Sequence, residues 1–475
     1  MVKRQGRRLG DVRVRVERVK PQAYDVRADS RIRRPPPPAA LVLVTGFALM
    51  ILAGTLILML PISSASGDWT RPLDALFTAT SAVCVTGLVV VDTASYWSPF
   101  GHVVLLVLIQ AGGFGFMTGS TLLLFVLVGR RTGLRDRILA QESTGVRDLG
   151  SVTTVLKRVA LFTIIAEGIG TVVLSLAFLA RYGDAGTAAW HGLFHSISAF
   201  NNAGFDLMGG FRSLTAFASD PFVLVPIALL ILVGGLGFAI VGDALAKRRW
   251  SRFALETKLV LLTTVFLLAA GTAAIALFEW SNPATLGTMP EGQRVLNAAF
   301  EATTLRTAGF SALPTGDLAV ASLFVVMALM FIGGASGSTA GGIKVNTFSI
   351  LLFTIISTAR GRPSAEAFGR RVPHLLIYRA LSVALLSVAA VFISALGLQL
   401  LSAESFVNVL FEAVSALGTV GASTGITVSL PDPARAWLIP AMYIGRLGPL
   451  TLVLALAART KPVRVRPAVE TIRIG

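Results

Sequence analysis

Four short phrases of similar sequence recur along this chain, each between two long apolar runs. They are FTATSAVCVTGL, FHSISAFNNAGF, FEATTLRTAGF and FEAVSALGTVGA. Each carries a glycine near its end (Gly87, Gly204, Gly309 and Gly421), and these glycines follow one another at about 110 residues, which indicates four copies of one unit. Four equivalent glycine segments predict one central site, to which each copy contributes backbone as in a selectivity filter.

The apolar content of the chain predicts an integral membrane protein. Hydrophobic residues make up 54% and charged residues 14% of the 475 residues, against about 25% charged in a soluble domain. Stretches long enough to cross a bilayer, about 20 residues, lie at 40–62, 100–128, 155–180, 222–245, 257–279, 318–358, 375–401 and 434–458. We therefore expect eight transmembrane helices in four pairs, each pair enclosing one phrase.

The positive charge of the chain orients these spans. The formal net charge is +17, and most Lys and Arg residues lie in five clusters, at 1–38, 130–158, 247–258, 360–379 and 459–473. These clusters fall between the pairs or at the chain ends, which places both termini and the inter-pair loops in the cytoplasm. Membrane lipid headgroups suit such clusters better than nucleic acid does.

Each repeat is expected to contain a short re-entrant pore helix. The segments LDALFTATSAV, HGLFHSISAF, RVLNAAFEATT and SFVNVLFEAVSAL cover only about 16–20 Å as helices, too short to span. The predicted fold is all-α, with eight transmembrane helices, four pore helices and fourfold pseudo-symmetry around one pore. Its expected parts are a basic tail at 1–38, repeats at 39–129, 130–247, 248–360 and 361–460, and a tail at 461–475.

The glycine of each phrase closes a predicted filter segment. Backbone carbonyls in these segments can replace the hydration shell of a cation, and the absence of acidic residues favours a monovalent ion such as potassium. For a single copy, a glycine turn in a packed loop is an equally good interpretation. The four filter segments are Val85-Thr86-Gly87, Asn202-Ala203-Gly204, Thr307-Ala308-Gly309 and Thr419-Val420-Gly421.

The span after each filter segment carries a second glycine cluster, near Gly113, Gly235, Gly334 and Gly445. In the first two repeats, close helix packing is the better interpretation of the glycine pair. In the fourth repeat Arg446 follows Gly445. A buried arginine is costly in a membrane and faces a cavity or a partner, so we expect a charged barrier below the filter. The alternative is a salt bridge to Glu412, Glu301 or Asp243.

The third repeat differs because residues 333–342, GGASGSTAGG, replace the middle of its second span. We call this segment the glycine loop. It is expected to break the helix and to gate the pore, and a static packed kink is the alternative. The predicted gate residues are Gly333, Gly334, Ser336, Gly337, Ser338, Thr339, Gly341, Gly342, Lys344 and Arg446.

Other site chemistries find little support. Cys84 is the single cysteine, so no intrachain disulfide can form. The four histidines lack metal-ligand spacing, and Glu167 lies too far along the chain from the other intramembrane acids to suggest an enzyme. A non-conducting scaffold would leave the four glycines unexplained.

The phrases, together with QAGGFGFMT, GGASGSTAGGIK and YIGRLGPLTL, resemble the Trk/Ktr/HKT superfamily of potassium transporters from about residue 40 to residue 460. The eight spans look most like the ion-translocating subunit of the bacterial Ktr system. The resemblance implies a homodimer in the bacterial inner membrane, potassium and also sodium as ions, and a cytosolic regulatory ring that carries the nucleotide site. It also implies the filter role of the four glycines, the gate role of the glycine loop and a pore role for Arg446.

These expectations combine into a potassium uptake protein with a channel-like pore rather than an enzyme. Gly87 favours potassium, because sodium-preferring plant members of the superfamily have serine at that position. The alternatives are a sodium- or proton-coupled potassium symporter, which would use alternating access, and a sodium-selective member of the same superfamily.

Overall fold

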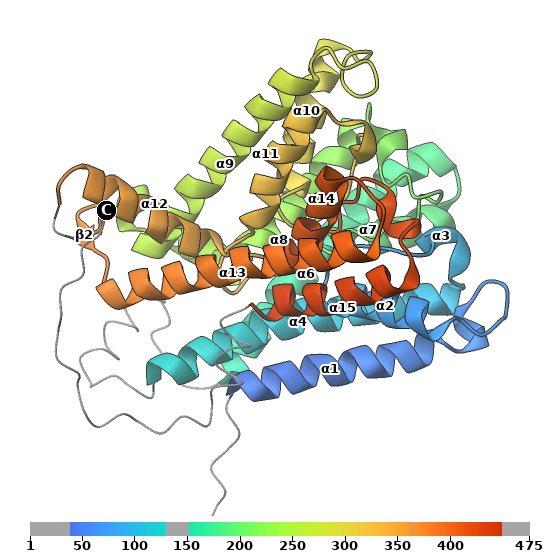
Figure 1. The fold of residues 1–475 in the computed structure, drawn as a ribbon, viewed down its shortest axis with the longest axis horizontal. Coiled ribbons are helices and arrows are strands. Elements are labelled where there is room, and N and C mark those ends of the chain that lie inside the picture. The colour runs from blue at the N-terminus through green and yellow to red at the C-terminus, as the bar shows by residue number, and fades with distance from the viewer. Residues whose placement is uncertain (1–38, 130–151, 363, 449–475) are drawn as a thin grey trace, which may run out of the picture. The chain divides into compact units, whose positions relative to one another are not determined.

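The computed structural model describes residues 39–129, 152–362 and 364–448. Both predicted tails, the loop 130–151 and the end of the last predicted span lie outside the described residues. The described part is mainly helical (Figure 1). Its helices are α1 (Ala39–Leu58), α2 (Pro72–Val83), α3 (Thr93–Tyr96), α4 (Pro99–Gly129), α6 (Val152–Tyr182), α7 (Ala185–Phe200), α8 (Pro221–Lys247), α9 (Leu255–Glu279), α10 (Glu291–Thr304), α11 (Val320–Phe331), α12 (Val345–Ala359), α13 (His374–Leu401), α14 (Phe406–Gly418) and α15 (Asp432–Leu447).

Six helices of the described residues, α1, α4, α6, α8, α9 and α13, are long and apolar enough to cross a membrane. The expected span at 318–358 instead forms two shorter helices, α11 and α12, separated by residues 332–344. This break confirms that the glycine loop interrupts a helix. The last expected span begins as α15, which is described only as far as Leu447. The total of eight spans therefore stays a prediction.

The four short helices occur where the sequence predicts them, as α2, α7, α10 and α14. At most two residues separate the end of each from its filter segment. Helix α7 begins at Ala185, earlier than expected, because the Asp184 side chain accepts the Thr187 N–H at 2.7 Å and caps the helix. The same hydrogen bond lowers the pKa of the Asp184 carboxyl.

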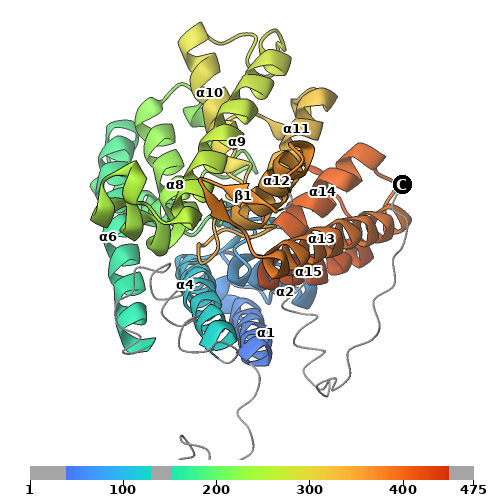
Figure 2. The ribbon, with the colours of Figure 1, turned by 90° about the vertical axis from the view of Figure 1, so that its left-hand side faces the viewer.

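The repeats pack on one another in cyclic order. The helix after each filter segment contacts the short helix of the next repeat: α4 packs on α7, α8 on α10, α11 on α14, and α15 returns to α2. Figure 2 shows the long helices arranged around the centre, with α1 beside α4. This order brings together segments that lie more than 300 residues apart in the sequence, such as Arg71 and Asp432, which form a salt bridge of 2.6 Å.

One element departs from the predicted all-α fold. A short antiparallel hairpin joins β1 (Glu366–Ala367) to β2 (Arg370–Arg371) in the connection between α12 and α13. Its two-residue turn, Phe368-Gly369, has φ of +50° and +72°. Two positive φ angles match the twist of a tight hairpin, and Gly369 makes such a turn accessible. In the sequence, Gly369 was the one residue that indicated this turn.

Candidate ion pore

The four filter glycines form a closed ring of contacts. A Cβ added to Gly87 would collide with the Ala203 carbonyl oxygen, one on Gly204 with that of Ala308, one on Gly309 with that of Val420, and one on Gly421 with that of Thr86. Each glycine therefore lies against the carbonyl of the residue that precedes the glycine of the next repeat. Each also has a positive φ, from +69° to +91°. Only glycine satisfies both conditions.

Hydroxyl groups of the short helices hold these segments in place. The Gly87 N–H donates to Ser81 Oγ at 3.0 Å, and the Gly421 N–H donates to Ser415 Oγ at 3.2 Å. In repeat 2, Ser198 Oγ donates instead to the Phe205 carbonyl at 2.7 Å. All three serines precede their filter glycine by the same interval, so the repeat pattern could have identified them. The sequence analysis missed them.

The first residue of each filter segment shows one departure from equivalence. Val85, Asn202 and Thr419 have φ of +55°, +59° and +48°, whereas Thr307 is not among the described residues with positive φ. The Thr307 hydroxyl lies 2.6 Å from the Asn202 side-chain amide, which links filter segments 2 and 3. All twelve predicted filter residues lie in this ring of segments, at the C-terminal ends of α2, α7, α10 and α14. The partial negative charge of helix C-termini favours a cation there.

The glycine pairs of the first two repeats serve close packing, as expected. A Cβ on Gly112 would collide with the Val83 carbonyl, and one on Gly234 with the Phe200 carbonyl. Gly445 makes the same approach to the Leu417 carbonyl in repeat 4. These contacts let each helix lie directly against the end of its own short helix, which positions the filter segment.

The glycine loop packs beneath filter segments 2 and 4. Its Thr339 N–H donates to the Gly234 carbonyl at 3.2 Å, and Thr339 Oγ1 donates to the Phe200 carbonyl at 3.1 Å. Helix α8 is kinked at Gly237, with φ of +74°, where residues 337 and 338 of the loop approach it. On the other side, a Cβ on Gly341 would collide with Thr419 Oγ1.

Hydrogen bonds also close the base of the glycine loop. The Gly333 N–H donates to the Ile343 carbonyl at 2.9 Å, and the Val345 N–H donates to the Gly334 carbonyl at 3.0 Å. The Ser336 N–H donates to Asn346 Oδ1 at 2.9 Å. Among the remaining predicted gate residues, Ser338 is fully buried and Gly342 has φ of +61°. The predicted gate residues of repeat 3 therefore form one compact structure.

Arg446 joins the fourth repeat to this loop. Its side chain is buried; Nη1 donates to the Thr339 carbonyl, and Nη2 donates to the Gly112 carbonyl at 3.2 Å. The guanidinium also lies over the Phe116 ring, 4.5 Å from its centroid. Lys344 Nζ lies over the same ring at 4.7 Å and donates to the Ala340 carbonyl. Two cations that share one aromatic ring therefore bind carbonyls of this loop.

The alternative salt bridge for Arg446 is wrong. None of the ion pairs among the described residues includes Arg446. Glu412 instead accepts hydrogen bonds from Ser423 and Thr427, and Glu301 accepts the N–H groups of Ala312 and Leu313. Asp243 pairs with Lys247 at 2.6 Å. The carboxylates brace loops of their own repeats, which leaves the Arg446 charge to backbone carbonyls and Phe116.

Phe116 and Arg306 are site residues that the sequence analysis missed. Phe116 lies in the first glycine cluster, QAGGFGFMT, where its aromatic ring gave no sign of a cationic partner. Arg306 directly precedes filter segment 3, and its Nη2 donates to the Gly333 carbonyl at 3.0 Å. A charged residue beside a filter segment was the available signal. The residues at the same place in the other repeats, Cys84, Asn201 and Gly418, are uncharged.

These features define a multi-pass membrane protein with a central ring of backbone segments. Residues 38–462 match the TrkH family, described as cation transport proteins, and the chain belongs to this family. It is 40% identical to the Ktr system potassium uptake protein B of Bacillus subtilis, over 90% of this chain and 94% of that protein. The expected resemblance to the Trk/Ktr group is thereby confirmed.

Two further relatives carry related names. The chain is 37% identical to the Ktr system potassium uptake protein B of Vibrio alginolyticus, over 91% of this chain and 94% of that protein. It is 36% identical to the potassium/sodium uptake protein NtpJ of Enterococcus hirae, over 90% of this chain and 95% of that protein. The crystal structure of the potassium transporter TrkH from Vibrio parahaemolyticus matches with a TM-score of 0.68 and 18% identity, over 90% of this chain and 86% of that one, which shows a shared fold.

Proposed function

We propose that this protein carries potassium into a bacterial cell through a channel-like pore whose filter consists of the four glycine segments. The observation that carries the proposal is the closed ring of glycine-to-carbonyl contacts formed by Gly87, Gly204, Gly309 and Gly421. Such a ring presents backbone oxygens without a carboxylate, which suits a monovalent cation. The names of three relatives, all potassium uptake proteins, support the choice of ion.

In this proposal the glycine loop and Arg446 together obstruct the path below the filter. The loop is bonded to α8 at Gly234, and its Thr339 carbonyl accepts a hydrogen bond from Arg446. A positive charge at this place would oppose the passage of a cation by Coulomb repulsion. Opening the path then requires the loop to leave both contacts.

The proposal also includes the assembly. The relatives named as Ktr system proteins suggest a cytosolic regulatory subunit, and we propose that this partner forms the nucleotide-binding ring. We further propose that the protein is a homodimer in the inner membrane, in contact with membrane lipids, with both termini in the cytoplasm. No nucleotide site on this chain is proposed.

Rescue of growth tests the proposed function. A bacterium that lacks its own potassium uptake systems would express this protein with a Ktr-type regulatory subunit and grow at low potassium. We expect the wild type to restore growth and Gly87→Ser to restore it less, because a Cβ at this position collides with the Ala203 carbonyl. Failure of the wild type to rescue, despite its presence in the membrane, would contradict potassium uptake.

Purified protein in liposomes separates the remaining alternatives. Uptake of radioactive rubidium without an imposed sodium or proton gradient is expected for a channel-like pore. Uptake that requires either gradient would instead indicate a symporter. Radioactive sodium taken up faster than rubidium would indicate a sodium-selective protein. The Enterococcus hirae relative is named as a potassium/sodium uptake protein, so sodium is worth testing.

A further inference from the structure

Arg306 is a buried cation for which the described residues provide no counter-ion. Its side chain is 5% exposed, and it directly precedes filter segment 3. None of the ion pairs among the described residues includes it. A buried charge of this kind is costly unless it is paired or fully hydrogen-bonded.

The hydrogen bonds of Arg306 leave one edge of its guanidinium without an acceptor. Nη2 donates to the Gly333 carbonyl at 3.0 Å, but Nε is buried and has no partner among the described residues. Arg446 also leaves Nε without a partner, yet it donates two hydrogen bonds and lies over the Phe116 ring. Within the described residues, Arg306 has one hydrogen bond to compensate its charge.

A cavity lies against Arg306, at the junction of repeats 2 and 3. Its polar lining residues are Arg306, Asn202, Thr264, Thr303 and Thr307, and no acidic residue lines it in the part of the chain that the structure describes. The cavity volume is about 20 Å³, which accommodates about one water-sized particle. A carboxylate or phosphate group is too large for this space. A monatomic anion matches the size of the cavity, and the unpartnered Arg306 Nε provides a charged donor for it.

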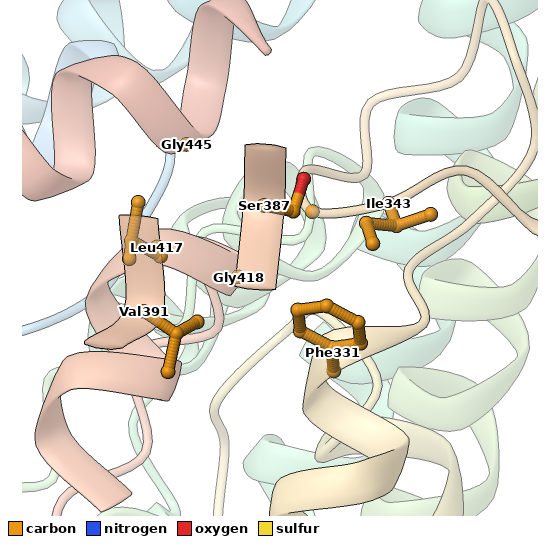
Figure 3. Close-up of a pocket in the computed structure, with 8 residues that line it drawn as sticks. Phe331, Ile343, Ser387, Val391, Leu417, Gly418 and Gly445 are labelled. Atoms are coloured by element: carbon orange, nitrogen blue, oxygen red, sulfur yellow. The ribbon is translucent and has the colours of Figure 1, made fainter. Parts of the chain in front are cut away.

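The junction of repeats 3 and 4 provides an internal comparison. A cavity of similar volume lies there, and Gly418 stands in its wall at the place in the repeat that Arg306 occupies in repeat 3. Figure 3 shows Phe331, Val391 and Leu417 around this cavity, with Ser387 as the one hydroxyl. Its lining carries no charge. Electrostatic attraction for an anion is therefore expected at one junction and not at the other.

We propose that the cavity beside Arg306 binds one halide ion, with chloride as the natural ligand, and that Arg306 Nε donates a hydrogen bond to it. The bound anion compensates the guanidinium charge directly behind filter segment 3. It thereby lets Arg306 hold the Gly333 carbonyl at the start of the glycine loop without presenting a net positive charge to a cation in the filter. This proposal does not rest on the identity of the transported ion.

Bromide provides a direct test on the full chain. Crystals of the detergent-purified protein grown with sodium bromide are expected to show an anomalous peak in the cavity, within hydrogen-bond distance of the Arg306 side chain. Arg306→Gln should remove the peak. Arg294→Gln is the control in the same repeat, on helix α10, because Arg294 already donates to three backbone carbonyls, and it should keep the peak.

A second measurement does not depend on the variant crystallising. At constant ionic strength, the midpoint of thermal unfolding of the wild type should be higher in chloride than in gluconate, because a ligand stabilises the state that binds it. Arg306→Lys should weaken this chloride dependence, since the Nε donor is lost. An empty or water-filled cavity in bromide, a peak that survives Arg306→Gln, or equal midpoints in both salts would overturn the proposal. None of these readouts involves transport, so a failed rescue experiment would not affect them.

Discussion

The glycine loop runs between two junctions whose cavities differ in charge and polarity. At its start, Gly334 lines the polar cavity that contains Arg306; at its end, Gly342 lines the apolar cavity that contains Gly418. The filter segments at the two junctions are alike, since Gly204 and Gly309 make the same contact with the next repeat. The filter is thus shared by the repeats, whereas the loop is held by a charge at one end and by apolar packing at the other.

This difference shows where the duplicated architecture has diverged. Positions that build the ring must remain glycine, because the collision with a carbonyl is the same in each repeat. The positions one residue before the segments carry cysteine, asparagine, arginine and glycine in the four repeats. The difference in charge between the repeats therefore lies directly before the filter segments rather than in them.

The largest effect is expected from Gly204→Ala and Gly309→Ala. Both place a Cβ against a carbonyl at a positive φ, where an L-residue costs at least about 1–2 kcal/mol before the collision is counted. We expect both variants to reduce rubidium uptake in liposomes to background. Gly67→Ala is the control, because Gly67 has φ of +78° with open space around it. Normal uptake by either filter variant would show that the two junctions do not share one filter.

Arg446→Gln tests the hold on the middle of the loop. Loss of the guanidinium group frees the Thr339 and Gly112 carbonyls and removes a positive charge. Rubidium uptake should therefore rise several-fold. Arg435→Gln is the matched control on α15, because Arg435 pairs with Asp74 away from the loop, and it should leave uptake near the wild-type rate. An unchanged rate and affinity in Arg446→Gln would remove this residue from the pore.

Arg306→Gln tests the charged end of the loop. It removes a charge-assisted hydrogen bond to Gly333, which is worth about 1.5–3 kcal/mol, so the midpoint of thermal unfolding should fall. Arg306→Lys keeps the charge but not the planar donor group, and it should show a smaller decrease. A midpoint equal to that of the wild type in Arg306→Gln would mean that the first end of the loop does not depend on this bond.

The smallest effect compares one hydroxyl in each cavity. Thr264→Val removes a polar group from the cavity beside Arg306 and should destabilise the protein by about 1 kcal/mol. Ser387→Val adds apolar volume to the cavity beside Gly418 and should change stability by less than about 0.5 kcal/mol. Thermal unfolding of both variants provides the measurement. Equal effects would indicate that the two cavities do not differ in polarity as their linings suggest.

Much of the local structure could be predicted from the repeated phrases. The short helices, the filter glycines and the break in the span at the glycine loop follow from local patterns, namely apolar length, helix-breaking glycine runs and position in the repeat. The hairpin at 366–371 was missed because its two-residue strands are too short to show alternation. The partners of Arg446 could not be predicted from the sequence, since Glu412, Glu301 and Asp243 were equally plausible. The structure shows that these acids bind Thr427, Ala312 and Lys247 instead.

The sequence by itself determined that this is a multi-pass membrane protein and indicated four similar units, because apolar length and repetition are properties of the chain read residue by residue. Only the tertiary structure decided which carbonyl each glycine meets, that Arg446 and Lys344 share the ring of Phe116, and that Arg306 faces a cavity while Gly418 borders an apolar one. Contacts between segments a hundred or more residues apart depend on the order in which the repeats close around their centre. That order is fixed by packing, which no single segment encodes.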